Sequence, residues 1–240
     1  MKKIEFDKLI IKEDEDYVVI NKPYGISTLE DRASNTNILK LAREYNPVLQ
    51  VCHRLDKETS GILVLAKNEI AYKHLNKQFA DRSVNKIYHA VVHGTNTLEY
   101  IMFSAPIKAL NSGLVKIDTV SGKESHTVFN TLEVFKFHSL MECNPVTGRT
   151  HQIRVHLSAM ERPIVGDVSY GGQPFFLSQY KPKYNIGKYE EERPLMDRVA
   201  LHSYSIKFKN PDGDTLYIEA EYPKDIHAIL RQMQKFSHSK

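Results

Sequence analysis

The stretch Cys52-His53-Arg54-Leu55-Asp56-Lys57-Glu58-Thr59-Ser60-Gly61 holds the densest cluster of ionisable side chains, and it runs directly into Ile62-Leu63-Val64-Leu65-Ala66. A short continuous apolar run of this kind is typical of a strand that is covered on both faces. The polar cluster therefore lies where a loop meets a buried strand. An Asp beside Arg, Lys and Glu is usually a solvated loop carboxylate, but loops held against a rigid strand commonly carry function. We therefore treat Asp56 as a candidate functional carboxylate.

The rest of the chain is predicted from its periodicity. Before the central stretch the pattern predicts two short strands, a Pro-Gly turn, and a helix capped by Asn35-Thr36. After it, a helix over residues 69–81 precedes a strand-rich region with two more helices. The expected strands cover residues 8–12, 17–21, 62–66, 87–92, 114–119, 127–134, 139–143, 202–208 and 215–221, and the later helices cover residues 150–160 and 225–236. Many antiparallel strands with a few interspersed helices predict an α+β fold.

Length and composition exclude several classes of protein. The chain has 240 residues, a formal net charge of +4, 11 Gly and 10 Pro, so collagen-like and wholly disordered proteins are excluded. No apolar run approaches the roughly 18 residues that a membrane span needs. The two cysteines make neither a disulfide framework nor a four-ligand zinc site. We expect a soluble, cytoplasmic protein without a metal or other cofactor.

Two further clusters carry candidate functional residues. In Thr147-Gly148-Arg149-Thr150-His151-Gln152-Ile153-Arg154-Val155-His156-Leu157, Arg154 borders the buried stripe of the expected helix. Its side chain either extends to solvent or pairs with a carboxylate, for which a planar guanidinium is well suited. In Asn85-Lys86-Ile87-Tyr88-His89-Ala90-Val91-Val92, Tyr88 is either an aromatic residue at the core edge or a flat wall for a nucleobase.

Residues 173–198 form a long stretch without periodicity, and the pattern predicts a surface insertion. Basic and aromatic side chains alternate in it, which suits contact with RNA, although a solvated loop explains them equally well. These side chains are Tyr180, Lys181, Lys183, Tyr184, Lys188 and Tyr189.

Taken together, the clusters resemble the RluA-type pseudouridine synthases. The stretch from His53 to Gly61 resembles the family signature His-Arg-Leu-Asp-x-x-Thr-Ser-Gly, with Lys57 and Glu58 at the two variable positions. The likeness extends over nearly the whole chain. Its other segments are Asn21-Lys22-Pro23-Tyr24-Gly25, Lys86-Ile87-Tyr88, Gly122-Lys123-Glu124-Ser125-His126-Thr127, the stretch from Thr147 to Leu157 quoted above, Pro163-Ile164-Val165-Gly166-Asp167-Val168-Ser169-Tyr170-Gly171 and Ala200-Leu201-His202.

The resemblance implies an α+β catalytic domain with a central, mainly antiparallel sheet, flanking helices and a cleft. It implies isomerisation of uridine to pseudouridine in RNA without metal or cofactor. Asp56 would be the catalytic residue and Arg154 its salt-bridge partner. Tyr88 would stack beside the target uracil, Leu201 would contact the base, and Arg54 would occupy the space left by the extruded nucleotide.

Three hypotheses follow for the function of the chain. The first is a pseudouridine synthase acting on ribosomal or transfer RNA, as a monomer whose single catalytic domain covers residues 1–240 without a separate N-terminal RNA-binding domain. The second is a hydrolase such as a glycosidase, which the absence of a paired second carboxylate in either motif disfavours. The third is a non-catalytic RNA-binding protein of the same fold, which would not require a carboxylate at Asp56.

Overall fold

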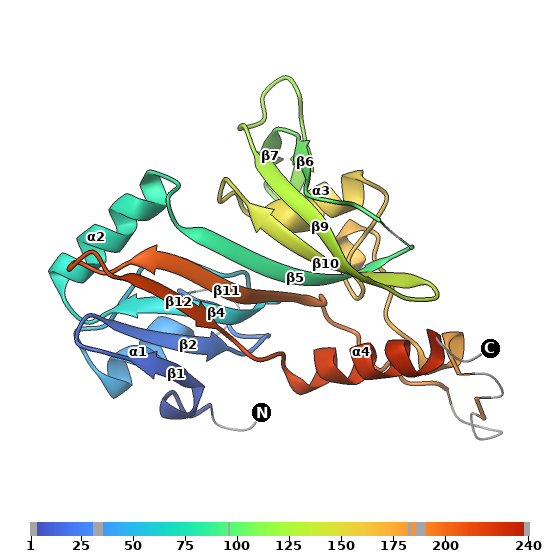
Figure 1. Cartoon of the computed structure of the whole chain (residues 1–240), viewed down its shortest axis with the longest axis horizontal. Helices are drawn as coiled ribbons and strands as arrows, with labels where there is room; N and C mark the ends of the chain where they lie inside the picture. Colours follow the sequence, from blue (N-terminus) through green and yellow to red (C-terminus); the bar gives the residue numbers. More distant parts are fainter. Residues whose placement is uncertain (1–3, 31–35, 96, 182–183, 186–190, 238–240) are drawn as a thin grey trace. The chain divides into compact units, whose positions relative to one another are not determined.

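The computed structural model describes residues 4–30, 36–95, 97–181, 184–185 and 191–237 (Figure 1). Four α-helices and twelve strands are found in these residues. The helices are α1 (Ile38–Tyr45), α2 (Glu69–Ala80), α3 (Gln152–Ala159) and α4 (Lys224–Ser237). The strands are β1 (Ile10–Glu13), β2 (Tyr17–Lys22), β3 (Gln50–Val51), β4 (Ser60–Ala66), β5 (Asn85–His93), β6 (Ile101–Ser104), β7 (Ile107–Ala109), β8 (Val115–Ile117), β9 (His126–Val134), β10 (His138–Pro145), β11 (Leu201–Lys209) and β12 (Thr215–Glu219). None of these helices has both the length and the apolar character needed to cross a membrane.

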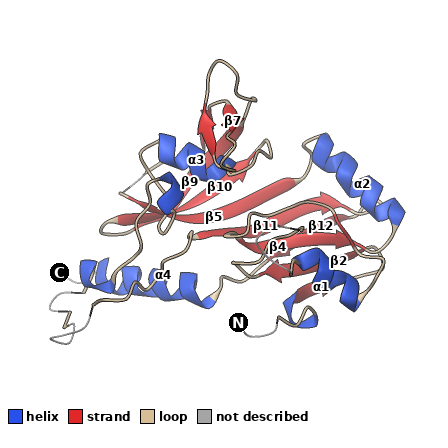
Figure 2. Cartoon of the chain, turned by 180° about the vertical axis from the view of Figure 1, so that it is seen from behind, coloured by secondary structure: helices blue, strands red, loops and turns tan. Residues whose placement is uncertain are grey.

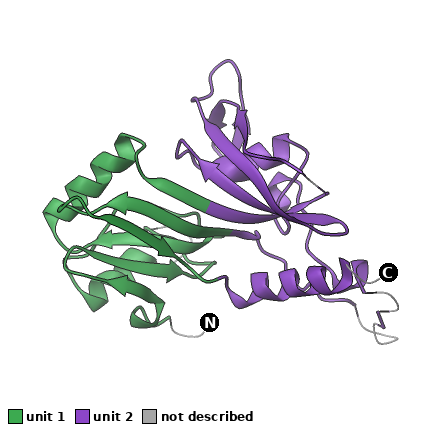
Figure 3. Ribbon diagram, in the orientation of Figure 1, with its two compact units in different colours: residues 1–87, 202–221 green, residues 88–201, 222–240 purple. Residues whose placement is uncertain are grey.

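The chain divides into two compact units, which Figure 3 shows in green and purple. Unit 1 is formed by residues 1–87 and 202–221, and unit 2 by residues 88–201 and 222–240. Each unit is therefore built from two separate segments of the chain, and neither is a continuous stretch of sequence. The expectation of one catalytic domain over residues 1–240 stays a prediction.

In unit 1 the strands pair in the order β1-β2-β4-β11, and β3 and β12 pair with β4 and β11 respectively. All these pairings are antiparallel except that of β4 with β11, which is parallel. Every residue of β4 is buried, as predicted for a strand covered on both faces. The buried side chains of α2, Ala71 and Leu75, join those of β2, β4, β11 and β12 in one hydrophobic cluster. This cluster fixes β4, and with it the end of the polar loop that precedes it.

In unit 2 the strands pair antiparallel in the order β5-β10-β9-β6, while β7 and β8 form a separate hairpin. Helix α3 lies beside β9 and β10, as both the front and the back view show (Figure 1, Figure 2). Its Ile153 and Leu157 belong to the main core cluster, with Phe129 of β9 and Met141 of β10. The expected α+β fold with a mainly antiparallel sheet is thus confirmed.

The structure corrects two sequence expectations. The cap of α1 is Asn37, whose side chain accepts a hydrogen bond from the Lys40 N–H, rather than Asn35-Thr36. Within residues 173–198, Phe175, Tyr180 and Met196 are at most 2% exposed and belong to the core of unit 2, so this stretch is not wholly a surface insertion. A stretch without periodicity gives no sign of burial, whereas the distant segments of unit 2 bring these aromatic side chains into the core. Lys183, Lys188 and Tyr189 lie outside the described residues.

Candidate active site

Asp56 lies on the loop that connects β3 to β4 in unit 1. Its backbone carbonyl accepts a hydrogen bond from the Thr59 N–H at 3.1 Å, which closes a tight turn immediately before the buried strand. The Asp56 side chain is half-buried, whereas the neighbouring Arg54 is exposed and Leu55 is buried. Neighbouring side chains of this extended segment point in opposite directions, so the buried Leu55 anchors the loop and the ionisable side chains beside it stay accessible.

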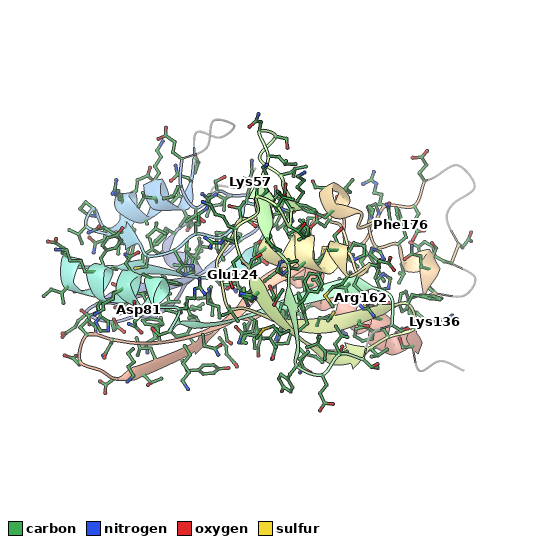
Figure 4. The ribbon with its side chains drawn as sticks, turned by 90° about the horizontal axis from the view of Figure 1, so that it is seen from above. Lys57, Asp81, Glu124, Lys136, Arg162 and Phe176 are labelled. Atoms are coloured by element: carbon green, nitrogen blue, oxygen red, sulfur yellow. The ribbon has the colours of Figure 1, made fainter. Side chains whose placement is uncertain are left out.

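Thr28 fixes the backbone on the N-terminal side of Asp56. The Thr28 Oγ1 accepts a hydrogen bond from the Leu55 N–H at 3.1 Å and donates one to the Leu55 carbonyl at 2.9 Å. On the other side of Asp56, the Gly25 N–H donates to the Lys57 carbonyl at 2.7 Å. Lys57 is labelled in Figure 4. The backbone is thus held on both sides of the candidate catalytic residue by residues from the segment 25–28.

A buried lysine supports the same segment. Lys22 is fully buried, and its Nζ donates to the carbonyls of Pro23 at 3.0 Å and Ile26 at 2.9 Å, with the Lys57 carbonyl at 3.5 Å. An ammonium group that is removed from water needs such acceptors, because a buried charge without partners is very costly. The motif from Asn21 to Gly25 therefore forms one hydrogen-bonded assembly with the Asp56 loop.

The histidine and the cysteine at the start of the loop have structural surroundings. The Val64 N–H donates to the His53 Nε2 at 3.1 Å, so this nitrogen carries no proton. Burial and the nearby Lys86 lower the pKa of His53 to about 3, which keeps the ring neutral at physiological pH. Burial raises the pKa of the Cys52 thiol to about 12, so Cys52 is not a thiolate nucleophile.

The end of the motif is packed against β11. The His202 Nε2 donates to the Ala220 carbonyl at 3.1 Å, so its Nδ1 accepts the hydrogen bond from the Ser60 hydroxyl at 3.0 Å. All three residues are buried in unit 1. Ser60 is therefore part of the framework rather than a nucleophile.

In unit 2, Arg154 of α3 is 4% exposed and forms a bidentate ion pair with Asp167. The Nε donates to one carboxylate oxygen at 2.7 Å and the Nη2 to the other at 2.8 Å. The guanidinium carbon also lies 5.0 Å from the centroid of the Tyr170 ring. Arg154 is therefore inside the protein and paired with a carboxylate, the second of the two alternatives that the sequence left open.

The N-terminus of α3 is held by the side-chain amide of Gln152. Its Oε1 accepts hydrogen bonds from the Thr147 hydroxyl at 2.7 Å and the Arg149 N–H at 3.1 Å. Its Nε2 donates to the His126 carbonyl at 2.8 Å and the Thr127 Oγ1 at 3.0 Å. A buried amide with both ends satisfied fixes the helix start, two residues before Arg154. Arg149 also donates from Nε to the carbonyl of Glu124, which is labelled in Figure 4.

The remaining predicted residues also lie in unit 2. Tyr88 on β5 is half-buried and packs against the main core cluster, and Leu201 at the start of β11 is 3% exposed within that cluster. Arg54 and Asp56 thus share a loop of unit 1, whereas Tyr88, Arg154 and Leu201 belong to unit 2. The expected ion pair between Asp56 and Arg154 would join the two units, and it stays a prediction.

Sequence reasoning missed the partner of Arg154. Asp167 lies in a turn between Gly166 and the pair Gly171-Gly172. A Cβ on Gly172 would come within 1.9 Å of the Ile164 carbonyl oxygen, so the turn is too tight for any other residue. An Arg at the border of a buried helix face, followed 13 residues later by an Asp in a glycine-rich turn, is a signal that could have suggested the pair.

Within the described part of the chain, no three or more His, Cys, Asp or Glu side chains gather in a group that could hold a metal ion. The expectation that the protein uses no cofactor stays a prediction.

Comparison with known proteins identifies the family. The model of the RNA pseudouridylate synthase family matches residues 16–159, a range that includes Asp56, Tyr88 and Arg154. The chain belongs to the RNA pseudouridylate synthase family. The family and the enzyme class that the sequence predicted, a pseudouridine synthase that isomerises uridine in RNA, are therefore confirmed.

Curated relatives cover most of this chain. Ribosomal large subunit pseudouridine synthase C of Buchnera aphidicola subsp. Baizongia pistaciae is 36% identical over 217 residues, which cover 87% of this chain and 64% of the relative. The protein of the same name from Vibrio parahaemolyticus is 33% identical over 236 residues, covering 96% of this chain and 71% of the relative. Ribosomal large subunit pseudouridine synthase D of Neisseria meningitidis serogroup A is 35% identical, covering 92% and 60%.

Solved structures show the same fold. Human RNA pseudouridylate synthase domain containing 1 has a TM-score of 0.71 and 27% identity, covering 93% of this chain and 87% of the human one. Human RNA pseudouridylate synthase domain containing 4 has a TM-score of 0.73 and 25% identity, covering 95% and 94%. The fold is thus that of pseudouridylate synthase domains.

Proposed function

We propose that this chain converts uridine to pseudouridine in the RNA of the large ribosomal subunit, with Asp56 as its catalytic residue. The observation that carries the assignment of Asp56 is the loop itself. A half-buried carboxylate lies on a backbone held by hydrogen bonds at Leu55 and Lys57, directly before a fully buried strand. A reacting group needs this kind of support, because small displacements of a catalytic group are costly in rate.

The reaction breaks an N–C glycosidic bond, turns the uracil and rejoins it through carbon. The Asp56 carboxylate would attack the sugar, attack the ring, or abstract a proton that begins an elimination. In each case the target base leaves its stack, which costs a few kcal/mol and least in an RNA loop. Stacking on an aromatic side chain stabilises the flipped base by about 1–3 kcal/mol and so offsets this cost. We assign the stacking to the ring of Tyr88.

The other predicted site residues enter this proposal with defined roles. Arg154 would be the second charge of the site, paired with Asp56 in the complex with RNA. Arg54, the exposed neighbour of Asp56, would fill the space that the target nucleotide leaves in the RNA. Leu201 would give the base an apolar contact.

Ribosomal RNA is preferred over transfer RNA because the curated relatives are named as ribosomal large subunit pseudouridine synthases. We propose that the chain acts as a monomer in the cytoplasm. Sedimentation of the purified protein tests the monomer, and a dimer at micromolar concentration would contradict it.

The test incubates the purified chain with large-subunit ribosomal RNA and, in parallel, with total transfer RNA. Pseudouridine is detected as stops of reverse transcription after carbodiimide treatment, because the isomer has the same mass as uridine. We expect new stops in ribosomal RNA with the parent chain and none with Asp56→Asn, which should still bind RNA. Stops in transfer RNA alone would reject the proposed substrate.

The same experiment separates the other two hypotheses. Release of free uracil would indicate a glycosidase, and RNA binding without any new stop would indicate a non-catalytic binding protein. Asp81→Asn is the matched control, since Asp81 is another aspartate of unit 1, at the end of α2 (labelled in Figure 4). We expect it to be as active as the parent chain.

A further inference from the structure

We propose that Asp167 is a positioning residue that fixes the guanidinium of Arg154 for the reaction. This inference rests on the proposed function, because it assigns Arg154 to the site that contains Asp56. It adds a second carboxylate to the machinery, one that holds the cation in place and does not touch the substrate.

The geometry of the ion pair supports this role. Both partners are buried, with side-chain exposures of 5% for Arg154 and 1% for Asp167. The two parallel hydrogen bonds run from Nε and Nη2 to the two carboxylate oxygens at 2.7 and 2.8 Å. A bidentate contact fixes the plane and the rotation of the guanidinium, which one hydrogen bond does not.

Tyr170 constrains the same guanidinium from its face. Asp167 precedes a short 3-10 helix, Val168–Tyr170, and Tyr170 is its last residue. Since a 3-10 helix has three residues per turn, residues i and i+3 lie on one side of it. The carboxylate and the aromatic ring therefore reach the edge and the face of Arg154 from one short segment.

The Tyr170 ring is itself held at its hydroxyl. The hydroxyl accepts a hydrogen bond from the Val115 N–H at 2.9 Å and lies 3.0 Å from the His151 Nδ1. On the other side of Asp167, a Cβ on Gly166 would lie 2.1 Å from the Arg198 carbonyl oxygen. The segment that carries Asp167 and Tyr170 is therefore fixed at both ends. Arg154 pairs with a carboxylate whose position is fixed by this segment.

Stability alone does not explain such a pair. Replacing a buried ion pair by apolar residues of similar volume is often neutral or stabilising, so an ion pair held in this way does not need to be there for the fold. A cation whose direction is set in advance by a carboxylate is, in contrast, what preorganised electrostatic catalysis needs.

A matched ion pair provides the control. Arg198 and Asp225 in the same unit also form a bidentate pair, with Nε and Nη2 at 2.8 and 2.7 Å from the two carboxylate oxygens. Neither residue has been assigned to the site. Asp225→Asn therefore makes the same chemical change as Asp167→Asn, in a pair whose carboxylate is 28% rather than 1% exposed.

The first test measures kcat and KM on the RNA that the parent chain modifies. We expect Asp167→Asn to lower kcat at least tenfold with KM changed less than threefold, and Asp225→Asn to keep kcat within twofold. Asp167→Glu retains the buried charge but displaces it by one methylene, so we expect it to fold and to lose kcat severalfold. Values of kcat within twofold of the parent for both Asp167 variants would overturn the inference.

The second test is a double-mutant cycle. Arg154→Lys removes the planar guanidinium, and we expect a loss of at least tenfold in kcat. If Asp167 acts through Arg154, then adding Asp167→Asn to Arg154→Lys lowers kcat no further than twofold. Independent, multiplicative losses would indicate a merely structural role and overturn the inference.

A third measurement does not depend on turnover. In the ¹⁵N NMR spectrum the Arg154 Nε–H should exchange slowly in the parent chain and in Asp225→Asn, but rapidly in Asp167→Asn. Unchanged exchange in Asp167→Asn would overturn the inference even if the chain modifies no RNA. An inactive parent chain with the expected NMR result would instead reject only the proposed function.

Discussion

A Cβ placed on Gly61 would lie 2.2 Å from the carbonyl oxygen of Ser203 and 2.6 Å from its backbone nitrogen. The two residues face each other in the parallel pairing of β4 with β11. Gly61 also has a φ of 110°, which disfavours residues with a side chain. The glycine that ends the Asp56 motif is therefore required by the close approach of a strand that lies 142 residues later in the sequence.

Gly61→Ala should destabilise the protein strongly. The Cβ would meet backbone atoms that no rotamer change can move, and we expect a loss on the order of 4 kcal/mol in the free energy of unfolding. Gly213→Ala is the control, since Gly213 has a φ of 92° but no atom within 4 Å of its Cβ position. It should cost about 1 kcal/mol. Urea unfolding measures both, and equal losses would contradict the packing argument.

Lys22→Met should loosen the support of the Asp56 loop. Methionine keeps the volume but leaves the Pro23 and Ile26 carbonyls without their donor, and we expect a loss of about 2 kcal/mol. Activity should fall as well, because the segment that contacts Lys57 is no longer held. Lys73→Met is the control, because Lys73 pairs with Glu69 across an exposed helix surface, and it should leave unfolding and activity unchanged. Wild-type stability in Lys22→Met would contradict this prediction.

Stability should fall in acid because of His138. This histidine is 2% exposed, its Nδ1 lies 2.9 Å from the Tyr180 hydroxyl, and its Nε2 has no hydrogen-bond partner in the described part of the chain. Burial, with a smaller effect of His93, lowers its pKa from 6.5 to about 3. The proton therefore binds the unfolded chain more tightly, and the contribution to stability is present above pH 6.5 and is lost as the pH falls toward 3.

Each such proton contributes about 1.4 kcal/mol per pH unit to the slope of stability against pH. Burial lowers the pKa of His53 to about 3 as well. Both histidines therefore contribute to the slope of stability against pH in the parent chain. His138→Gln should reduce the slope of stability against pH between pH 6 and 4 by the contribution of about one proton, which is about 1.4 kcal/mol per pH unit. Urea unfolding at a series of pH values measures it, and an unchanged slope would show that His138 is not buried as a neutral ring.

Tyr88 should act through its ring rather than its hydroxyl. We expect Tyr88→Leu to lower the rate at saturating RNA about 10- to 100-fold, which corresponds to the stacking contribution of one base. Tyr88→Phe keeps the ring and should stay within about threefold of the parent chain. Single-turnover kinetics distinguish them. Equal losses in both variants would assign the role to the hydroxyl instead.

Local patterns predicted most of the elements. The alternation and apolar runs of β2, β4 and β9 and the helical stripe of α2 were recognised, because each buries a face whose period is written in the sequence. The sequence does not predict strand β6, because Ile101–Ser104 has no buried face and is defined by its pairing with β9. The sequence also does not predict the burial of Phe175 and Tyr180, because their burial depends on a core made by distant segments.

For the site, the sequence by itself determined the family, the reaction class and the identity of the candidate residues, since these depend on residue types at fixed spacing. Only the tertiary structure decided which atoms surround them. It brought Lys22 to the carbonyls around the Asp56 loop, Ser203 to Gly61, and Asp167 to Arg154. Local spacing does not specify such pairs, because the direction of a side chain and its partner from a distant segment are set by the packing of the whole unit.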